Sequence, residues 1–180
     1  MSYIILERTY DEPLPVPLSH TAWDNFNDQF DRCLEMREIH WVQSLISRDG
    51  RRSLCLFEAP YADAVREACR ESRAPFDQVW RAEIWMGTLV NPKLVCDSVI
   101  AAEATYRFPM TKELWDQGVQ RARACAIELE VQRLFTLMSA KRQQSICLFN
   151  AASAETVRSF YRRVGIPFDL VWRADVLAAQ

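Results

Sequence analysis

An internal repeat constrains this chain more than any other feature of its sequence. The stretch PFDQVWRAEIW, residues 75–85, returns near the end as PFDLVWRADVL, residues 167–177. A shift of 92 residues aligns residues 53–85 with residues 145–177, and 16 of these 33 pairs are identical. A solenoid generally needs about three or more stacked units of a shorter period. The repeat therefore predicts the duplication of one small domain.

Both copies have the same predicted order of secondary structure. In the first copy, the branched and aromatic residues at 3–9 are typical of a strand. Apolar residues at helical spacing predict a helix over about residues 20–36, with Ser19 as its N-cap. A hairpin follows with Gly50 at its tip, and a second helix over about residues 61–72 precedes the last strand. The order is therefore βαββαβ, twice.

This order predicts an α+β fold with two tandem ferredoxin-like domains, each an antiparallel sheet with both helices on one face. The copies are expected at residues 1–87 and 94–180, joined by a linker at residues 88–93. Because an exposed apolar sheet face favours association, we expect the two sheets to pack face to face as an intramolecular pseudo-dimer of the dimeric α/β-barrel type. Such pairing leaves a further homo-oligomer open. In the second copy, Ser153 should cap a helix and Gly165 should end it.

Charge and composition exclude several classes of partner. The formal net charge is -2 and both signs are mixed along the chain, which argues against nucleic acid and anionic membranes as partners. No window reaches the roughly 18 apolar residues of a membrane span, and the first residues have no basic leader. We therefore expect a cytoplasmic protein. The six cysteines form no C-x-x-C pair and are expected to be buried thiols.

Strand alternation predicts which residues could meet a ligand. The more uniformly apolar face of each strand should pack on the helices, which assigns Trp80 and Trp172 to the core. The opposite faces would line a shared chamber between the sheets, aromatic with a few charges, as small-ligand sites commonly are. The predicted ligand-binding residues are Glu7, Trp41, Gln43, Phe57, Arg81, Glu83, Trp85, Phe135, Phe149, Arg173 and Asp175. Cys55, Arg133 and Cys147 are expected on the same faces, with Val99 in the place of Glu7 in the second copy.

The first copy resembles a family of small ferredoxin-like domains of mostly unknown function, whose best characterised type is a dimeric bacterial nickel-binding, nickel-responsive protein. The motifs that carry the resemblance are Glu7-Arg8-Thr9, Trp41-Val42 with Ser44, Cys55-x-Phe57, Ala59-Pro60 and Pro75-x-Asp77-x-Val79. The resemblance implies nickel as a cofactor. However, Gln43 and, in the second copy, Phe135 stand where the family has a histidine, and nickel prefers imidazole ligands. His20 and His40 are the only histidines, so we assign no residue as a metal ligand.

Three functions are compatible with these features. The first is binding of a small, partly apolar and anionic molecule, with Arg81 and Arg173 supplying the charge. The second is the nickel or other transition-metal binding that the resemblance implies. The third is a cofactor-free isomerase, cyclase or monooxygenase of the two-fold ferredoxin-like barrel type, with Glu7 as general base and Arg81 as oxyanion stabiliser. Arg81 with Glu7, and Arg173 with Asp175, could also be partners that only satisfy one another.

Overall fold

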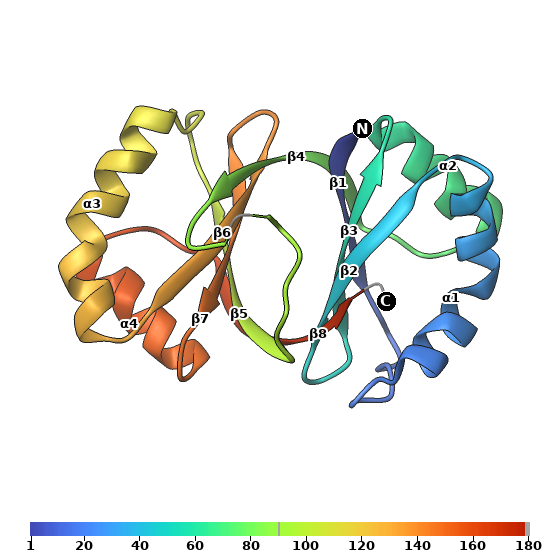
Figure 1. Cartoon of the computed structure of the whole chain (residues 1–180), viewed down its shortest axis with the longest axis horizontal. Coiled ribbons are helices and arrows are strands. Elements are labelled where there is room, and N and C mark those ends of the chain that lie inside the picture. Colours follow the sequence, from blue (N-terminus) through green and yellow to red (C-terminus); the bar gives the residue numbers. More distant parts are fainter. Residues whose placement is uncertain (90, 179–180) are drawn as a thin grey trace. The chain divides into compact units, whose positions relative to one another are not determined.

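The computed structural model describes residues 1–89 and 91–178 (Figure 1). The first copy contains β1 (Ser2–Thr9), α1 (His20–Glu35), β2 (His40–Ser47), β3 (Arg52–Ala59), α2 (Ala62–Ser72) and β4 (Gln78–Met86). The second contains β5 (Ser98–Thr105), α3 (Lys112–Glu128), β6 (Gln132–Ser139), β7 (Gln144–Asn150), α4 (Ala154–Val164) and β8 (Leu170–Ala178). The predicted βαββαβ order is confirmed in both copies.

The hydrogen-bonded strand order confirms the ferredoxin-like arrangement. It runs β4-β1-β3-β2 in the first copy and β8-β5-β7-β6 in the second. The chain divides into two compact units. Unit 1 comprises Met1–Ala82, Lys93–Asp97 and the described residues from Ala174 onward, and unit 2 comprises Glu83–Pro92 and Ser98–Arg173. Strands β4 and β8 therefore contribute to both units. The predicted domain boundaries and the face-to-face packing of the two sheets stay predictions.

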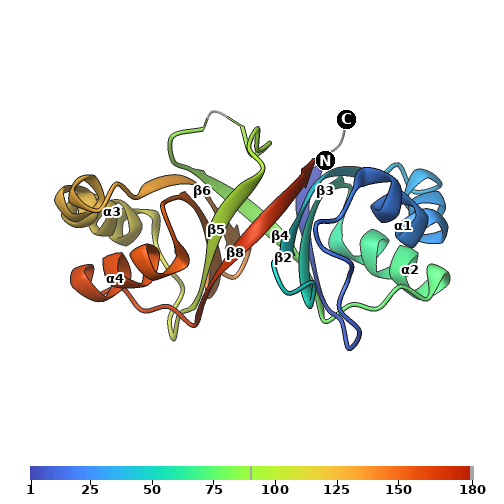
Figure 2. The ribbon, with the colours of Figure 1, turned by 90° about the horizontal axis from the view of Figure 1, so that it is seen from below.

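In unit 1, the helices α1 and α2 lie on one face of the sheet (Figure 2). Helix α1 begins as predicted, because the Ser19 hydroxyl accepts a hydrogen bond from the Ala22 amide at 3.1 Å. The inward side chains Trp23 and Phe30 are buried, and the Phe30 ring meets Phe57 of β3 edge to face at 6.0 Å. Helix α1 is therefore packed directly onto the sheet.

A buried arginine completes the space between α1 and the sheet of unit 1. Arg8 is only 2% exposed, and its Nη1 donates to Asn27 Oδ1 at 2.9 Å. Its guanidinium carbon lies 4.6 Å from the centroid of the Phe30 ring, within cation–π distance. Aromatic and cationic side chains thus pack together in this core.

In unit 2, the two helices are packed unequally. Helix α4 is capped by Ser153 and ends at Gly165, whose φ of 69° is left-handed, as the sequence predicts. It buries Phe160 and Tyr161 against the sheet. Helix α3 instead buries only Ala122 among its residues. The α3 side of unit 2 is therefore less filled than the α1 side of unit 1.

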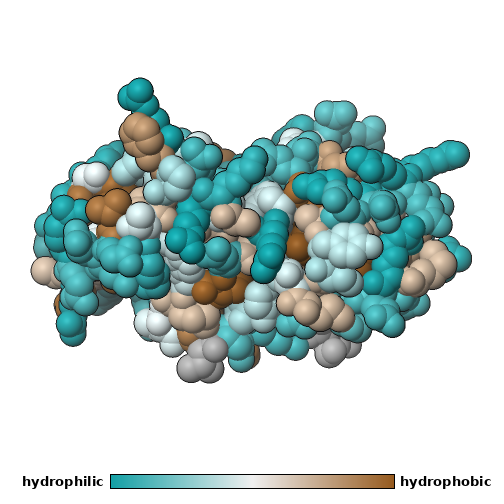
Figure 3. Space-filling model, turned by 90° about the horizontal axis from the view of Figure 1, so that it is seen from above, coloured by the Kyte–Doolittle hydropathy of each residue, from teal (hydrophilic) through white to brown (hydrophobic). Residues whose placement is uncertain are grey.

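The surface agrees with the charged composition. Hydrophilic residues dominate the face seen in Figure 3, and hydrophobic residues are scattered among them. Among the described residues, no helix is long and apolar enough to cross a membrane, and the cytoplasmic location stays a prediction. Cys33, Cys55, Cys69 and Cys147 are buried as predicted, whereas Cys125 is half-buried and Cys96 is exposed.

Candidate functional site

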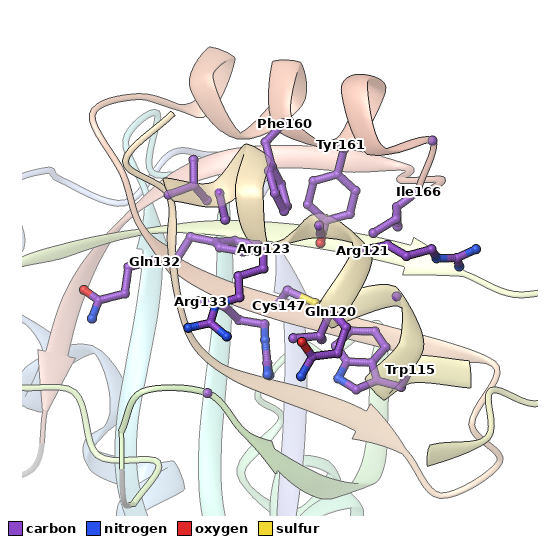
Figure 4. Close-up of a pocket in the computed structure, with 18 of the residues that line it drawn as sticks. Trp115, Gln120, Arg121, Arg123, Gln132, Arg133, Cys147, Phe160, Tyr161 and Ile166 are labelled. Atoms are coloured by element: carbon purple, nitrogen blue, oxygen red, sulfur yellow. The ribbon is translucent and has the colours of Figure 1, made fainter. Parts of the chain in front are cut away.

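Unit 2 contains a cavity of about 970 Å³ between α3, α4 and the sheet (Figure 4). Its size lies at the upper end of the ~300–1,000 Å³ typical of ligand pockets. Phe160 and Tyr161 project into it from α4, and Cys147 of β7 lies among the lining side chains. Trp115 and the residues around Ala122 form the α3 wall. The lining is mostly apolar and aromatic, as in sites for small organic molecules.

The cavity exists because α3 has small residues where α1 has large ones. At the repeat offset of 92, Phe26, Phe30 and Leu34 on one side of α1 become Gly118, Ala122 and Ala126 of α3. The replacements of Phe30 and Leu34 remove side chains that are buried above the sheet in unit 1, whereas Phe26 is 48% exposed there.

Helix α4 has larger side chains than α2 at two positions, and these occupy part of the space that the small residues of α3 leave. Phe160 and Tyr161 stand where α2 has Ala68 and Cys69. Both rings contact Phe149 edge to face, at 6.1 and 5.9 Å. The exchange gives the cavity an aromatic wall on one side and leaves the α3 side open.

Arg133 is the charged group of the cavity. It occupies the repeat position of Trp41, and its guanidinium carbon lies 5.6 Å from the centroid of the Trp115 ring. Its Nη1 donates to the carbonyl of Trp85 at 3.1 Å and to Thr136 Oγ1 at 3.3 Å. Among the described residues, no carboxylate forms an ion pair with Arg133, and burial lowers its pKa. A cation without an anion therefore lines a largely apolar cavity.

The thiol of Cys147 and the phenol of Tyr161, which line the cavity near Arg133, are neutral. Burial raises the pKa of the Cys147 thiol and holds the pKa of the Tyr161 hydroxyl well above its usual value. The Cys147 sulfur accepts a hydrogen bond from Thr136 Oγ1 at 3.3 Å. Neither group is poised as a thiolate nucleophile or a phenolate base at neutral pH. The Trp115 indole nitrogen is buried without a hydrogen-bond partner among the described residues.

The charges around the cavity are mainly positive. Arg121 and Arg123 of α3 are exposed and line it together with Arg133, whereas Glu130 is the one acidic residue of the lining. Figure 4 shows Arg121 pointing away from the other labelled side chains. An excess of positive charge at a cavity attracts anions.

Several predicted chamber residues lie on the helix side instead. Phe57 and Cys55 belong to the core beneath α1 and α2, and Phe149 and Cys147 belong to the core beneath α4. Their assignment to the opposite face was wrong. The physical reason is that both faces of β3 and β7 are apolar, so alternation alone does not choose between them.

A β-bulge also reverses the prediction for Trp41. The register of β2 shifts between Trp41 and Gln43, so Trp41 turns toward α1 and packs on Trp23 with ring centroids 6.5 Å apart. Arg133 turns toward the helices at the matching bulge of β6. Gln43 keeps the predicted face, and so does Phe135, which pairs with Leu148 on the face away from the helices.

The tryptophans of the repeated strand face away from the helices, contrary to the prediction. Trp80 Nε1 donates to Glu7 Oε1 at 2.6 Å, and Trp172 Nε1 donates to Glu103 Oε1 at 2.6 Å. Glu103 therefore takes the place of Glu7 in the second copy, and the prediction for Val99 was wrong. The first strand is offset by 96 residues rather than 92, because the loop that follows it is four residues shorter in the second copy.

The predicted charged residues of β4 and β8 do not gather at one site within a unit. Arg81 is exposed and pairs in register with Ile4, which belongs to the helix-side core. Asp175 pairs in register with Ile46 on the same side of unit 1. In unit 2, Arg173 Nη2 donates to Ser98 Oγ at 3.0 Å. The side assignments of these three residues were therefore wrong.

Glu83 and Trp85 belong to unit 2. Glu83 Oε2 accepts from Trp85 Nε1 at 3.4 Å and forms an ion pair with Arg142 at 3.3 Å. The Trp85 ring meets Trp115 of α3 edge to face at 5.4 Å. Trp85 thus supports the α3 wall of the cavity from outside it.

The described residues do not fit the nickel site that the resemblance implies. They contain no cluster of three or more His, Cys, Asp or Glu side chains that could hold a metal ion. Gln43, at the family's histidine position, accepts a hydrogen bond from the Leu94 amide at 2.8 Å through Oε1. His20 Nε2 contacts the Ala178 carbonyl at 3.0 Å, and His40 is exposed.

Strand alternation missed the cavity, because the cavity lies on the helix side of the sheet. The signal was nevertheless present in the repeat. Aligning α1 with α3 at the offset of 92 shows large residues replaced by small ones at successive positions on one side of the helix. A comparison of the two helices, rather than of the strands, would have located it.

The strand order and the cavity define a tandem ferredoxin-like protein with one ligand-sized pocket in unit 2. Residues 5–81 match the family model of the nickel-responsive SCO4226-like proteins. The resemblance predicted from the sequence is thus confirmed for the first copy. A comparison with curated proteins gave no match.

Solved structures show similar folds. Over 98% of this chain and 94% of the other, the chain resembles a putative chlorite dismutase, TA0507, with 10% identity and a TM-score of 0.51. SCO4226 from Streptomyces coelicolor A3(2) matches 41% of this chain and 90% of its own, with 19% identity and a TM-score of 0.38. A heme-binding protein from Thermus thermophilus matches 98% of this chain and 91% of its own, with 9% identity and a TM-score of 0.49. At these identities the likeness to TA0507 shows the fold alone.

Proposed function

We propose that the protein binds a small, partly apolar organic molecule in the cavity of unit 2. The observation that carries this proposal is the unpaired guanidinium of Arg133 in an aromatic cavity of about 970 Å³. Without a ligand, the apolar walls of this cavity would be in contact with water, which a bound apolar molecule would displace. Buried donors without acceptors are rare in folded proteins, and Trp115 Nε1 beside the cavity is one of them. A bound molecule accounts for both features.

Binding is favoured over catalysis by the state of the cavity's polar groups. Burial keeps Cys147 and Tyr161 protonated at neutral pH. Glu7, the predicted general base, lies in unit 1 and accepts a hydrogen bond from Trp80. The cavity therefore has groups that orient a ligand but no activated nucleophile with a base partner.

Native mass spectrometry of freshly purified protein tests this proposal directly. We expect a retained small molecule, or uptake of one from a cell extract, in the wild-type protein. Ala122→Phe restores the residue that fills this space in the first copy and should abolish the retained mass. Ala124→Phe, on the exposed side of the same helix, is the matched control and should keep it.

A second cavity-filling variant keeps the test informative if Ala122→Phe does not fold. Ala126→Leu also restores a first-copy residue and should weaken binding with a smaller change of the core. Circular dichroism and a thermal melt establish that both variants are folded. If the folded Ala122→Phe and Ala126→Leu proteins retain the molecule as the wild type does, the cavity is not the binding site.

Nickel binding is the second candidate, because residues 5–81 match a nickel-responsive family. The described side chains offer no ready ligand cluster, so a site would have to form by rearrangement. Nickel titration followed by calorimetry tests it. Heat and a stoichiometry near one metal per chain would support this candidate, and less than about 0.1 metal per chain would remove it.

A further inference from the structure

We infer that the ligand of the unit 2 cavity is an aromatic acid, whose ring takes the place of a missing phenylalanine and whose acid group pairs with Arg133. This inference rests on the proposed binding function and specifies the class of ligand. It follows from comparing the cavity with the equivalent space in unit 1, where the chain itself fills the site.

Unit 1 shows what this space holds when it is full. The Phe30 and Phe57 rings meet edge to face at 6.0 Å, and the Arg8 guanidinium carbon lies 4.6 Å from the centroid of the Phe30 ring. An aromatic ring here thus contacts both a second ring and a guanidinium. Phe30 is 4% exposed, so its ring is almost completely enclosed.

Unit 2 lacks this ring on α3 and has changed surroundings, in which Phe160 and Tyr161 of α4 already meet Phe149 edge to face. Phe149 stands in the place of Phe57, whereas Ala122 stands in the place of Phe30. A guanidinium is again present, but Arg133 supplies it from β6, since the position of Arg8 on the first strand is taken by Ala104 of β5. A planar aromatic ligand would restore the missing contacts, because edge-to-face ring pairs and cation–π contacts both stabilise it.

The acid group follows from the state of Arg133. In unit 1, the Arg8 guanidinium has Asn27 as its one acceptor among the described residues and is enclosed by the core beside the Phe30 ring, with Nε and Nη2 buried without a hydrogen-bond partner. Arg133 has a backbone carbonyl and a hydroxyl on Nη1, while Nε and Nη2 have no acceptor among the described residues. A carboxylate matches the guanidinium fork with two parallel hydrogen bonds.

The surroundings of the cavity favour the same charge. Arg121, Arg123 and Arg133 outnumber the single Glu130 among its charged lining residues. Exposed arginines beside a cavity raise the local concentration of anions and speed their association. A neutral aromatic molecule would gain from the aromatic wall but not from these charges.

Calorimetric titration with 2-naphthoate and its neutral isostere 2-naphthamide tests the inference. In the wild-type protein, we expect naphthoate to bind about tenfold to a hundredfold more tightly, as charged hydrogen bonds generally do. Arg133→Gln should remove this preference, with a much larger loss of affinity for naphthoate than for naphthamide, which loses only the cation–π contact. Arg81→Gln, an exposed arginine of the first copy, is the control and should keep the preference.

The outcomes separate this inference from the proposed function. If both compounds bind the wild-type protein equally, or if Arg133→Gln keeps the preference for naphthoate, the pairing of an acid group with Arg133 is wrong. The cavity then remains a binding site. Loss of both compounds in Ala122→Phe places them in the cavity. If neither compound binds the wild-type protein and the purified protein retains no other molecule, the inference and the proposed function both fail.

Discussion

Replacing Phe30 by alanine should destabilise unit 1 strongly, because it removes the ring that fills the space left open in unit 2. Phe30 is 4% exposed and lies between Phe57 and the Arg8 guanidinium. Phenylalanine-to-alanine changes in a core cost about 3–5 kcal/mol. The Arg8 guanidinium would also lose its aromatic neighbour while staying buried. We therefore expect the upper part of that range.

Urea denaturation followed by tryptophan fluorescence measures this loss, since Trp23 and Trp41 are stacked in the same core. For a chain of this length, about 3–5 kcal/mol corresponds to a fall in Tm of roughly 6–20 °C. Phe108→Ala, at a ring that is 70% exposed, is the control and should change stability by less than about 1 kcal/mol. A loss below about 1 kcal/mol for Phe30→Ala would refute the claim that this ring fills the unit 1 core.

Three further substitutions test the electrostatics of the two copies. Trp80→Phe removes a hydrogen-bond donor to Glu7 and should lower the free energy of unfolding, measured in urea, by about 1.5–3 kcal/mol. Trp172→Phe removes the corresponding donor to Glu103 in the second copy and should give a loss of similar size. Losses below about 0.5 kcal/mol would mean that the carboxylates find other donors. Burial, and then Asp24, raise the pKa of Asp31 from 3.8 to about 6. Between these values the folded state binds more protons than the unfolded state, so this group's contribution to stability falls as pH rises. Asp31→Asn should therefore stabilise the protein above about pH 6 and lose that advantage toward pH 4, and an advantage independent of pH would contradict this assignment.

The sequence of each copy predicted the fold because local sequence patterns specify its helices and turns. Helix caps, the Gly50 turn and helical periodicity depend on neighbours in sequence, and Ser19, Ser153 and Gly165 all lie where these patterns predict. The faces of β3 and β7 were assigned wrongly, since these strands carry apolar residues on both sides and alternation gives no preference there. In β4 the more apolar side was assigned to the helices, but Val79 lies in the helix-side core and Trp80 bonds Glu7 on the other face. The bulge after Trp41 added a second reversal that no residue type announces.

The position of the candidate site follows from how the two copies differ rather than from what they share. The first copy matches the family model and fills its helix-side core with its own aromatic and arginine side chains. In the second copy, the cavity-lining residues of α3 are small, and α4 supplies two rings that α2 lacks. If the second copy had only lost packing volume, we would expect larger apolar residues at the positions next to the cavity. Instead, Arg133 replaces Trp41 beside the void and places a charge where the first copy has an indole. Arg133 is half-buried, and Arg8 of unit 1 is a fully buried guanidinium that also has no ion pair among the described residues, so the lack of an anion does not by itself require a ligand. What distinguishes Arg133 is its place in the lining of a ligand-sized cavity, where a bound anion could pair with it.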